Sequence, residues 1–322
     1  MKVSKSVLAA VMLLAAVPAF GQSYPNRPVR FISPFPPGTG IDIISRAVGD
    51  RLSPALGQPV VVENRPGAGG TIGAAVVAKA APDGYTVLIQ SSSHTASPFL
   101  YSNLPFDTVQ DFSAVTMLAV LPQVLVVAPD NSRGIGSVKD LVAYAKAHPG
   151  QLNYASAGNG SATHMADEKF KVAAGIDAVH IPFKGTPEAM TDIMAGRVDY
   201  MFAPIVSAME LIKSGKLKAI AMGADKRAPQ LSDVPTTAEA GVPNADYIFW
   251  AAMFVPSKTP PAVVSRLYQE TTKVLQSPEM KERLAALGAE PWSMKGEAVN
   301  ALVKKELSDN AALIKTAGIQ AN

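Results

Sequence analysis

Short runs of β-branched and aromatic residues alternate along this sequence with alanine-rich segments of helical length, and this alternation limits the fold more than any other feature. The expected strands cover residues 29–35, 59–63, 85–90, 123–128, 152–155, 179–182, 198–202, 217–222 and 247–255. The expected helices include residues 42–56, 71–79, 138–148 and 164–174. The pattern predicts an α/β fold with largely parallel sheets.

The chain is too long for one ordinary domain. It has 322 residues, of which 48% are hydrophobic, whereas a single domain usually has ~100 to 200 residues. We therefore expect two lobes, with the chain crossing between them near residues 121–124 and 246–250. The first lobe would comprise residues 22–122 and 246–322, and the second residues 123–245.

The N-terminus has the features of a secretory signal peptide. Lys2 and Lys5 precede an apolar run at residues 7–17, and small residues follow up to Gly21. The apolar run is about half of the ~20 residues that a membrane-spanning helix needs. We expect a signal at residues 1–21, cleavage near Gly21 and export to the periplasm. Because the sequence has no cysteine, it offers no lipid-attachment site, no disulfide and no thiolate ligand.

The charge of the chain excludes several classes of partner. The formal net charge is +3, and two of the lysines lie in the expected signal, so the exported chain is nearly neutral. We expect no binding to nucleic acid or to membrane surfaces. The four histidines include no metal-binding pair at helical spacing and no phosphate loop is found, so neither a metal nor a cofactor is expected.

Four segments place small, hydrogen-bonding residues where an expected strand ends and a helix begins, which is where α/β proteins bind ligands. Glycines let a ligand approach the backbone, and the free amides at a helix start carry partial positive charge, so these segments predict an anion site. The alternative is that they are only capped turns. The candidate residues are Phe35, Gly38, Thr39, Asp42, Ser92, Thr95, Gly158, Ser161, Thr163, His164, Phe183, Lys184, Gly185 and Thr186.

Two further alternatives concern individual residues. Asp42 is expected in the first turn of a helix, where an acid is favoured by the helix dipole, or it fixes the loop or accepts a hydrogen bond from the ligand. Ser161 and His164 could suggest a secreted serine hydrolase, but Ser161 lacks the nucleophile-elbow pattern. The glycines at residues 67–73 lack the spacing of a dinucleotide loop. No catalytic residue is therefore assigned.

Several long motifs resemble the tripartite tricarboxylate transporter receptors, also called Bug proteins. They are Arg-Pro-Val-Arg-Phe-Ile at residues 27–32, Pro-Phe-Pro-Pro-Gly at 34–38, Glu-Asn-Arg-Pro-Gly-Ala-Gly-Gly at 63–70, Asn-Tyr-Ala-Ser-Ala-Gly at 153–158 and Glu-Ala-Gly at 239–241. The motifs occur in the expected order after an export signal. The resemblance extends from Tyr24 nearly to the C-terminus.

This resemblance implies a two-lobed periplasmic binding protein of the Venus-flytrap type, type II-like, with its ligand cleft between the lobes. It implies a receptor that captures a small carboxylate, such as an organic acid, an aromatic carboxylate or an acidic amino acid, for membrane permease subunits. We expect the receptor to be a monomer. A receptor that signals to a sensor kinase of a two-component system would use the same site. In such receptors the carboxylate is held mainly by backbone and hydroxyl donors, at positions that match Phe35, Gly38, Thr39, Asp42, Gly158, Ser161, Thr163 and His164.

Three positions depart from the family pattern. Thr39 stands where glycine is common, Phe183 where tyrosine is common, and Ala203 where an acidic residue often occurs. Loss of that acid weakens the case for an α-amino ligand. The departures favour a plain or aromatic carboxylate.

Overall fold

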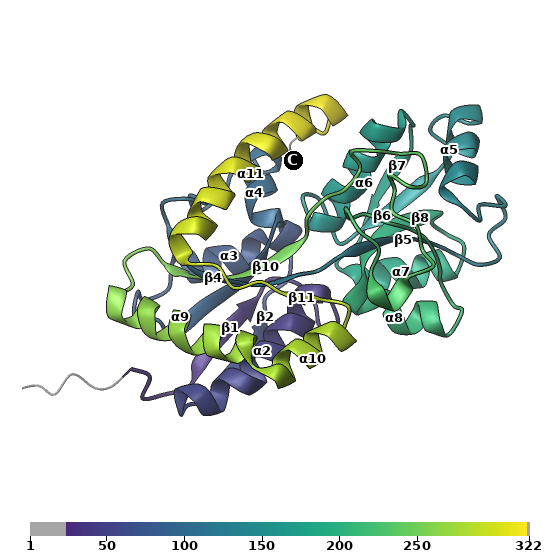
Figure 1. Ribbon diagram of the computed structural model, residues 1–322. Coiled ribbons are helices and arrows are strands. Elements are labelled where there is room, and N and C mark those ends of the chain that lie inside the picture. Colours follow the sequence, from purple (N-terminus) through teal and green to yellow (C-terminus); the bar gives the residue numbers. More distant parts are fainter. Residues whose placement is uncertain (1–23, 321–322) are drawn as a thin grey trace, which may run out of the picture.

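A computed structural model that describes residues 24–320 shows two β-sheets, each flanked by helices (Figure 1). The six-stranded sheet has the order β11(Glu290–Pro291), β4(Phe112–Val120), β10(Trp250–Pro256), β3(Thr86–Ser91), β1(Val29–Ser33) and β2(Val60–Asn64). The five-stranded sheet has the order β7(Val179–Pro182), β6(Asn153–Ser156), β8(Tyr200–Pro204), β5(Gln123–Val127) and β9(Lys218–Met222). The α/β prediction is confirmed. The predicted signal peptide lies outside the described residues.

We call the six-stranded sheet with its helices the first lobe and the five-stranded sheet with its helices the second lobe. Helices of the first lobe are α2(Gly40–Leu56), α3(Thr71–Ala78), α4(Ser93–Leu100), α9(Pro261–Gln276), α10(Pro278–Ala286) and α11(Gly296–Ala317). Helices of the second lobe are α5(Val138–Ala147), α6(Ala162–Ala174), α7(Thr186–Met194) and α8(Ile205–Lys213). Two 3₁₀ turns, η1(Ala68–Gly70) and η2(Pro229–Leu231), complete the described elements.

The prediction of largely parallel sheets is wrong. β1 pairs in parallel with β2 and β3, and β6 pairs in parallel with β7 and β8. However, β10 is antiparallel to β3 and β4, and β5 is antiparallel to β8 and β9. β5 and β10 are the first strands after each crossing between the lobes, so they run away from the cleft. The strands that precede the binding loops run toward the cleft. They are therefore antiparallel to β5 and β10 where they pair with them.

Each lobe has its own apolar core. In the first lobe, α2 and α9 pack on the sheet around Phe31, Ile44 and Leu267, all of which are fully buried. In the second lobe, apolar clusters cover both faces of the five-stranded sheet, with Phe170 on one face and Met201 on the other. The burial of a sheet on both faces accounts for its nearly continuous apolar strands.

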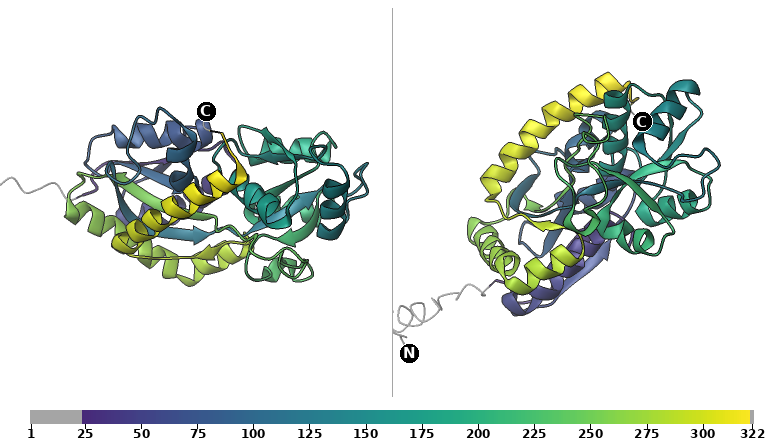
Figure 2. Two further views of the ribbon diagram at one scale, coloured as in Figure 1. Left: turned by 90° about the horizontal axis from the view of Figure 1, so that it is seen from above. Right: turned by 45° about the vertical axis from the view of Figure 1, so that its right-hand side comes forward.

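Helix α11 connects the two lobes. It packs on α4 and β4 of the first lobe and on α6 of the second, and Figure 2 shows it reaching from one lobe toward the other. A small cluster at this contact contains Ala96 and Leu100 from α4, Met165 from α6 and Ile314 from α11. The C-terminal helix therefore holds the outer side of the interface between the lobes.

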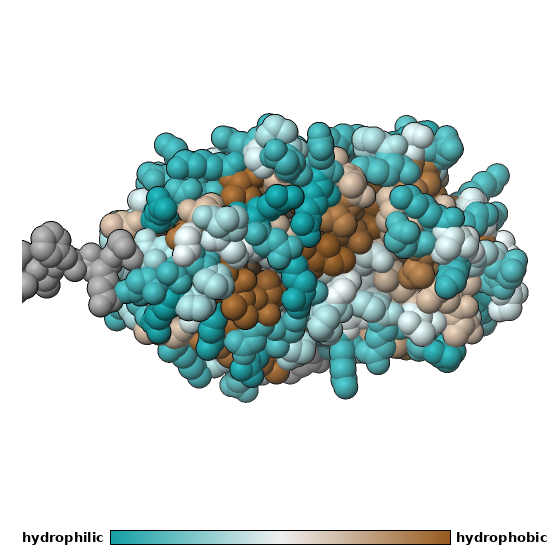
Figure 3. All heavy atoms as spheres, turned by 90° about the horizontal axis from the view of Figure 1, so that it is seen from below, coloured by the Kyte–Doolittle hydropathy of each residue, from teal (hydrophilic) through white to brown (hydrophobic). Residues whose placement is uncertain are grey.

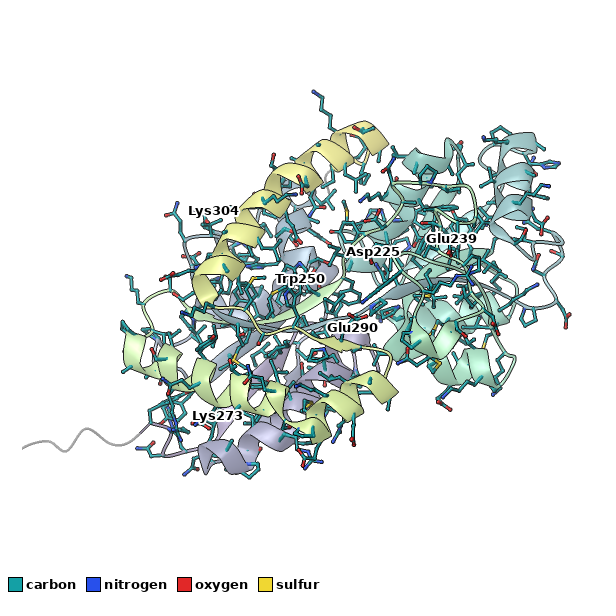
Figure 4. The ribbon with its side chains drawn as sticks, viewed as in Figure 1. Asp225, Glu239, Trp250, Lys273, Glu290 and Lys304 are labelled. Atoms are coloured by element: carbon teal, nitrogen blue, oxygen red, sulfur yellow. The ribbon has the colours of Figure 1, made fainter. Side chains whose placement is uncertain are left out.

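A buried polar network fixes α11 to the first lobe. The indole Nε1 of Trp250, which Figure 4 labels, donates to Glu306 Oε1 at 2.8 Å and to Oε2 at 3.0 Å. The hydroxyl of Thr95 donates to Glu306 Oε2 at 3.1 Å, and Asn310 Nδ2 donates to the Thr95 hydroxyl at 2.8 Å. Burial raises the pKa of Glu306 to about 7, although the hydrogen bonds from Trp250 and Thr95 oppose the shift.

This pKa predicts a pH-dependent stability. The folded state binds the Glu306 proton more tightly than the unfolded state, so the stabilisation is fully present below pH ~4.5 and is lost as the pH rises through 7. Between pH 4.5 and 8, the free energy of unfolding of wild type should fall by on the order of 3 kcal/mol more than that of Glu306→Gln. Urea titrations at several pH values measure the difference. Identical pH profiles for the two proteins would contradict the assignment.

Candidate functional site

Two adjoining cavities lie between the lobes. The inner cavity holds about 20 Å³, room for roughly one water, and the outer cavity holds about 550 Å³. Phe35 and Ala157 line both. The other residues of the inner cavity are Thr39, Gly40, Ile41, Ser91, Ser161, Ala162, Thr163, Thr186 and Phe249. The other residues of the outer cavity are Pro36, Pro66, Gly67, Ala68, Gly69, Gly70, Tyr101, Gly158, Asn159, Pro182, Phe183 and Lys184.

Three helices begin at the inner cavity. α2 begins at Gly40 in the first lobe, and α6 and α7 begin at Ala162 and Thr186 in the second. Ser161 caps α6 by accepting a hydrogen bond from the His164 amide at 3.3 Å, whereas no described side chain caps α2 or α7. The free amides of a helix start carry partial positive charge. None of the described residues lining this cavity carries a formal charge, so it offers an anion only neutral donors.

The hydroxyl groups at the inner cavity differ in whether their O–H is free to donate a hydrogen bond to a ligand. Thr39 donates to the Pro36 carbonyl at 2.8 Å. Thr163 accepts from the Ala157 amide at 2.9 Å and shares one hydrogen bond with Ser161 at 3.0 Å, so this pair keeps one free O–H. The Thr186 hydroxyl has no partner among the described residues. The second lobe thus presents at least two hydroxyl donors to the cavity.

Asp42 fixes the first binding loop. Its Oδ2 accepts from the Gly38 amide at 3.0 Å, and its Oδ1 accepts from Arg46 Nε at 3.0 Å and Asn64 Nδ2 at 2.8 Å. Burial alone would raise the pKa of Asp42, but these hydrogen bonds from Arg46, Asn64 and Gly38 outweigh it and lower the pKa. Of the roles considered for Asp42, the structure supports the fixing of the loop, because Asp42 lines neither cavity.

The structure places several predicted site residues away from the cavities. Ser92 is buried directly before α4, and Thr95 lies where α4 packs on α11 and is already bonded to Asn310 and Glu306. The Gly38 amide is used by Asp42, and the Gly38 carbonyl accepts from Ser207 of the second lobe at 3.2 Å. Their small or polar side chains serve the packing of helices and lobes, which the sequence pattern does not distinguish from ligand contact.

His164 and Gly185 also line neither cavity. The His164 ring is buried behind the loop at residues 156–161, and its Nδ1 accepts from the Gly160 amide at 3.1 Å. Gly185 precedes α7 and approaches the first lobe, because a Cβ there would lie 3.0 Å from Pro36 Cγ. By contrast, Phe35, Thr39, Gly158, Ser161, Thr163, Phe183, Lys184 and Thr186 all line a cavity.

Some lining residues were not predicted from the sequence. The glycines at residues 67–70 were noted as a family motif and rejected as a nucleotide loop but were not predicted to line the site, yet they form one wall of the outer cavity, and Gly67, Gly69 and Gly70 all have positive φ. Tyr101 and Phe249 also line cavities. The run of glycines directly after a strand was a usable signal for the loop, whereas nothing in the local sequence marks the two aromatic residues.

The two lobes touch across these cavities. The Tyr101 hydroxyl donates to the Asn159 carbonyl of the second lobe at 2.9 Å, and Ser207 bonds to Gly38. A Cβ at Gly69 would lie 2.2 Å from the Asn159 carbonyl oxygen. From below, Figure 3 shows apolar side chains gathered where the lobes meet. The structure therefore shows a closed arrangement of the lobes.

A third cavity of about 360 Å³ lies at the crossings between the lobes. Its lining includes Leu121 and Pro122 of the first crossing and Asp225 and Glu290, which Figure 4 labels. Phe249 lines both this hinge cavity and the inner cavity, so one residue of the second crossing separates them.

Comparison with known proteins decides the family. The model of the tripartite tricarboxylate transporter family receptor matches residues 44–319. The chain belongs to this receptor family. Protein BugT of Bordetella pertussis is 35% identical over 94% of this chain and 93% of BugT. A solved R. palustris protein with adipate is 33% identical, covers 93% of this chain and 100% of that chain, and has a TM-score of 0.89.

A second solved relative is MatC from Rhodopseudomonas palustris with bound malate. It is 31% identical, covers 90% of this chain and 100% of that chain, and has a TM-score of 0.84. The family consists of periplasmic solute-binding receptors, so the chain is a receptor of the Venus-flytrap type and not an enzyme. The helices within residues 24–320 include none with the length and apolar character needed to span a membrane.

The contact at Gly69 predicts a variant that binds poorly without unfolding. Gly69→Ala places a Cβ against the Asn159 carbonyl and should prevent closure, weakening ligand binding at least about tenfold. Gly57→Ala is the matched control, since Gly57 also has positive φ but a Cβ there meets nothing within 4 Å. Both should lose about 1 kcal/mol of stability. Calorimetric titration with adipate as the first ligand tested measures the affinity of each variant. Equal affinities for both variants would contradict the closure contact.

Proposed function

We propose that this protein is an exported periplasmic receptor that captures a small carboxylate between its lobes and presents it to the permease of a tripartite tricarboxylate transporter. We also propose residues 22–122 and 246–322 as the first lobe, residues 123–245 as the second, and a monomer as the working state. The order of the strands supports this division. All strands before residue 121 and after residue 249 belong to the six-stranded sheet, and all strands between residues 122 and 223 belong to the five-stranded sheet.

The observation that carries the proposal is the inner cavity. Helix starts from both lobes and free hydroxyls of the second lobe face a space whose lining, within residues 24–320, includes no charged residue. One carboxylate oxygen needs about the room of the single water that this cavity holds and accepts several hydrogen bonds, so it matches this set of donors. Hydrogen bonds to a charged group contribute ~1.5 to 3 kcal/mol each. A few of them, with the helix starts, are enough for the ~8 kcal/mol of micromolar affinity.

The outer cavity receives the rest of the ligand. Its walls are largely apolar, with Phe35, Pro36 and Phe183 on its sides. Lys184 is the only charged residue among the described residues that line it. This surface suits an aliphatic or aromatic body, and Lys184 could pair with a second acidic group. Relatives solved with adipate and with malate, both dicarboxylates, support the same ligand class.

Binding of a carboxylate should raise the melting temperature, because a ligand that binds only the folded state adds about 2.7 kcal/mol of stability at a hundredfold excess over Kd. The panel contains adipate, malate and benzoate, with adipamide as the uncharged control. We expect at least one acid, and not adipamide, to stabilise the protein. Fluorescence of Trp292, which lines the hinge cavity, provides a second readout of closure. Stabilisation by adipamide equal to that by adipate would contradict the carboxylate site.

The free hydroxyl of Thr186 allows a test of a single donor. Thr186→Val keeps the volume nearly constant and removes one hydrogen bond to the ligand, so affinity should fall by ~1.5 to 3 kcal/mol, roughly ten- to a hundredfold. Thr191→Val on the same helix is the control, because the exposed Thr191 hydroxyl bonds only to the Pro187 carbonyl. Titration calorimetry with the strongest acid of the panel gives both affinities. A Thr186→Val protein that binds as tightly as Thr191→Val would exclude Thr186 as a ligand donor.

A further inference from the structure

Two histidines lie directly behind the binding loop of the second lobe, one buried (His164) and one partly buried (His180), and neither lines a cavity. His164 is on α6 and His180 on β7, and their rings stack with centroids 4.0 Å apart and planes inclined by 16°. The ring of Tyr154 lies nearly parallel to both imidazoles, with its centroid 4.9 Å from His180 and 6.3 Å from His164. Neither histidine lines a cavity, so any effect of the pair on binding has to pass through the loop.

Each histidine is connected to one part of the loop at residues 156–161. His180 Nε2 is 2.6 Å from the Ser156 hydroxyl, and that oxygen accepts from the Gly158 amide at 3.1 Å. His164 Nδ1 accepts directly from the Gly160 amide at 3.1 Å. Gly158 has φ +111° and Gly160 has φ +71°, so both are in the left-handed region. The Gly160 amide is thus held by His164, and the Gly158 amide is held by the Ser156 hydroxyl that contacts His180.

The turn between these two anchors faces the cleft. Asn159 and Gly158 line the outer cavity, and the Asn159 carbonyl accepts the hydrogen bond from Tyr101 of the opposing lobe. The loop then continues into the start of α6 at the inner cavity. One loop geometry thus sets both a wall of the ligand site and a contact that closes the lobes.

We propose that His164 and His180 are positioning residues of the receptor, which as a stacked, uncharged pair hold residues 156–161 in the shape that the ligand and the opposing lobe require. The proposal rests on the proposed function, because it concerns the same site. The acceptor role of His164 requires Nδ1 to carry no proton. A charged His164 would present N–H on both nitrogens and repel the Gly160 amide.

The surroundings keep the pair uncharged near neutral pH. Burial lowers the pKa of His164 to about 4 and that of His180 to about 3. The charged groups that act on the pair are Glu168 and Lys171 on α6, and the ring of Tyr154 on β6 stacks beside it, while Asp167 on α6 and Tyr200 on β8 act on Tyr154. Glu168 accepts from Tyr154 and from Lys171 Nζ, and its Oε1 lies 3.9 Å from His164 Nε2. Lys171 therefore neutralises the Glu168 carboxylate, which would otherwise stabilise a charged His164.

Two substitutions at His164 separate positioning from packing. His164→Phe keeps an aromatic ring for the stack but removes the acceptor, whereas His164→Asn loses the ring and places Oδ1 where Nδ1 was. We expect His164→Phe to weaken adipate binding at least about tenfold and His164→Asn to recover most of the affinity. A purely structural role predicts the opposite order, since the ring matters there and the acceptor does not.

Two further readouts complete the test. Hydrogen exchange at the Gly160 amide, measured by NMR without ligand, should be faster in His164→Phe and remain slow in His164→Asn. As the pH falls from 6 to 4, wild type should lose more affinity than His164→Asn, with protonation of the ligand common to both. Equal exchange in the two variants, or an affinity order with asparagine weaker, would overturn the proposal. If wild type binds no acid of the panel, the proposed function fails, and the exchange rates still decide whether His164 holds the loop.

Discussion

The whole site depends on one constraint, which is that the chain crosses between two separate sheets and brings helix starts from both to the same small space. α2 contributes from the first lobe, and α6 and α7 contribute from the second. Because no lobe alone holds all the donors, an anion bound there is bound by both lobes. Capture of the ligand and closure of the lobes are therefore one thermodynamic event, and the hydrogen bond from Tyr101 to Asn159 adds to the same closed state.

The use of neutral donors has a physical reason. A lysine or arginine in the inner cavity would need to leave water itself, and this desolvation offsets much of its attraction to the ligand. Backbone amides at a helix start are already oriented and partly desolvated, so they stabilise an anion at a smaller cost. The chain keeps its formal charges outside this space, as Asp42 shows by pairing with Arg46 behind the loop. A receptor that has to release its ligand again benefits from such moderate binding.

Much of the fold and part of the site could be predicted from the sequence. The loops at residues 35–42, 157–164 and 183–187 were recognised because glycine and hydroxyl residues stand between a strand and a helix. β4 was missed because its apolar residues are buried on both faces and show no period that separates strand from helix. Strand direction could not be predicted, because it follows from the crossings. Likewise, Thr95 and His164 have the chemistry of ligand contacts, and only the tertiary structure shows that they face α11 and the loop.

In the proposed function, the two cavities contact different parts of the ligand. The polar groups of the inner cavity are helix-start amides and hydroxyls, so the proposed preference for a carboxylate depends on loop geometry more than on any one side chain. The outer cavity is lined by side chains such as Phe183 and Lys184, which can change without disturbing the helix starts. Relatives about one third identical to this chain have been solved with adipate and with malate, which differ in length and polarity but share the carboxylate. If the proposed function holds, the outer cavity would distinguish one ligand from another, while the inner cavity and the loops that shape it would select for an acid.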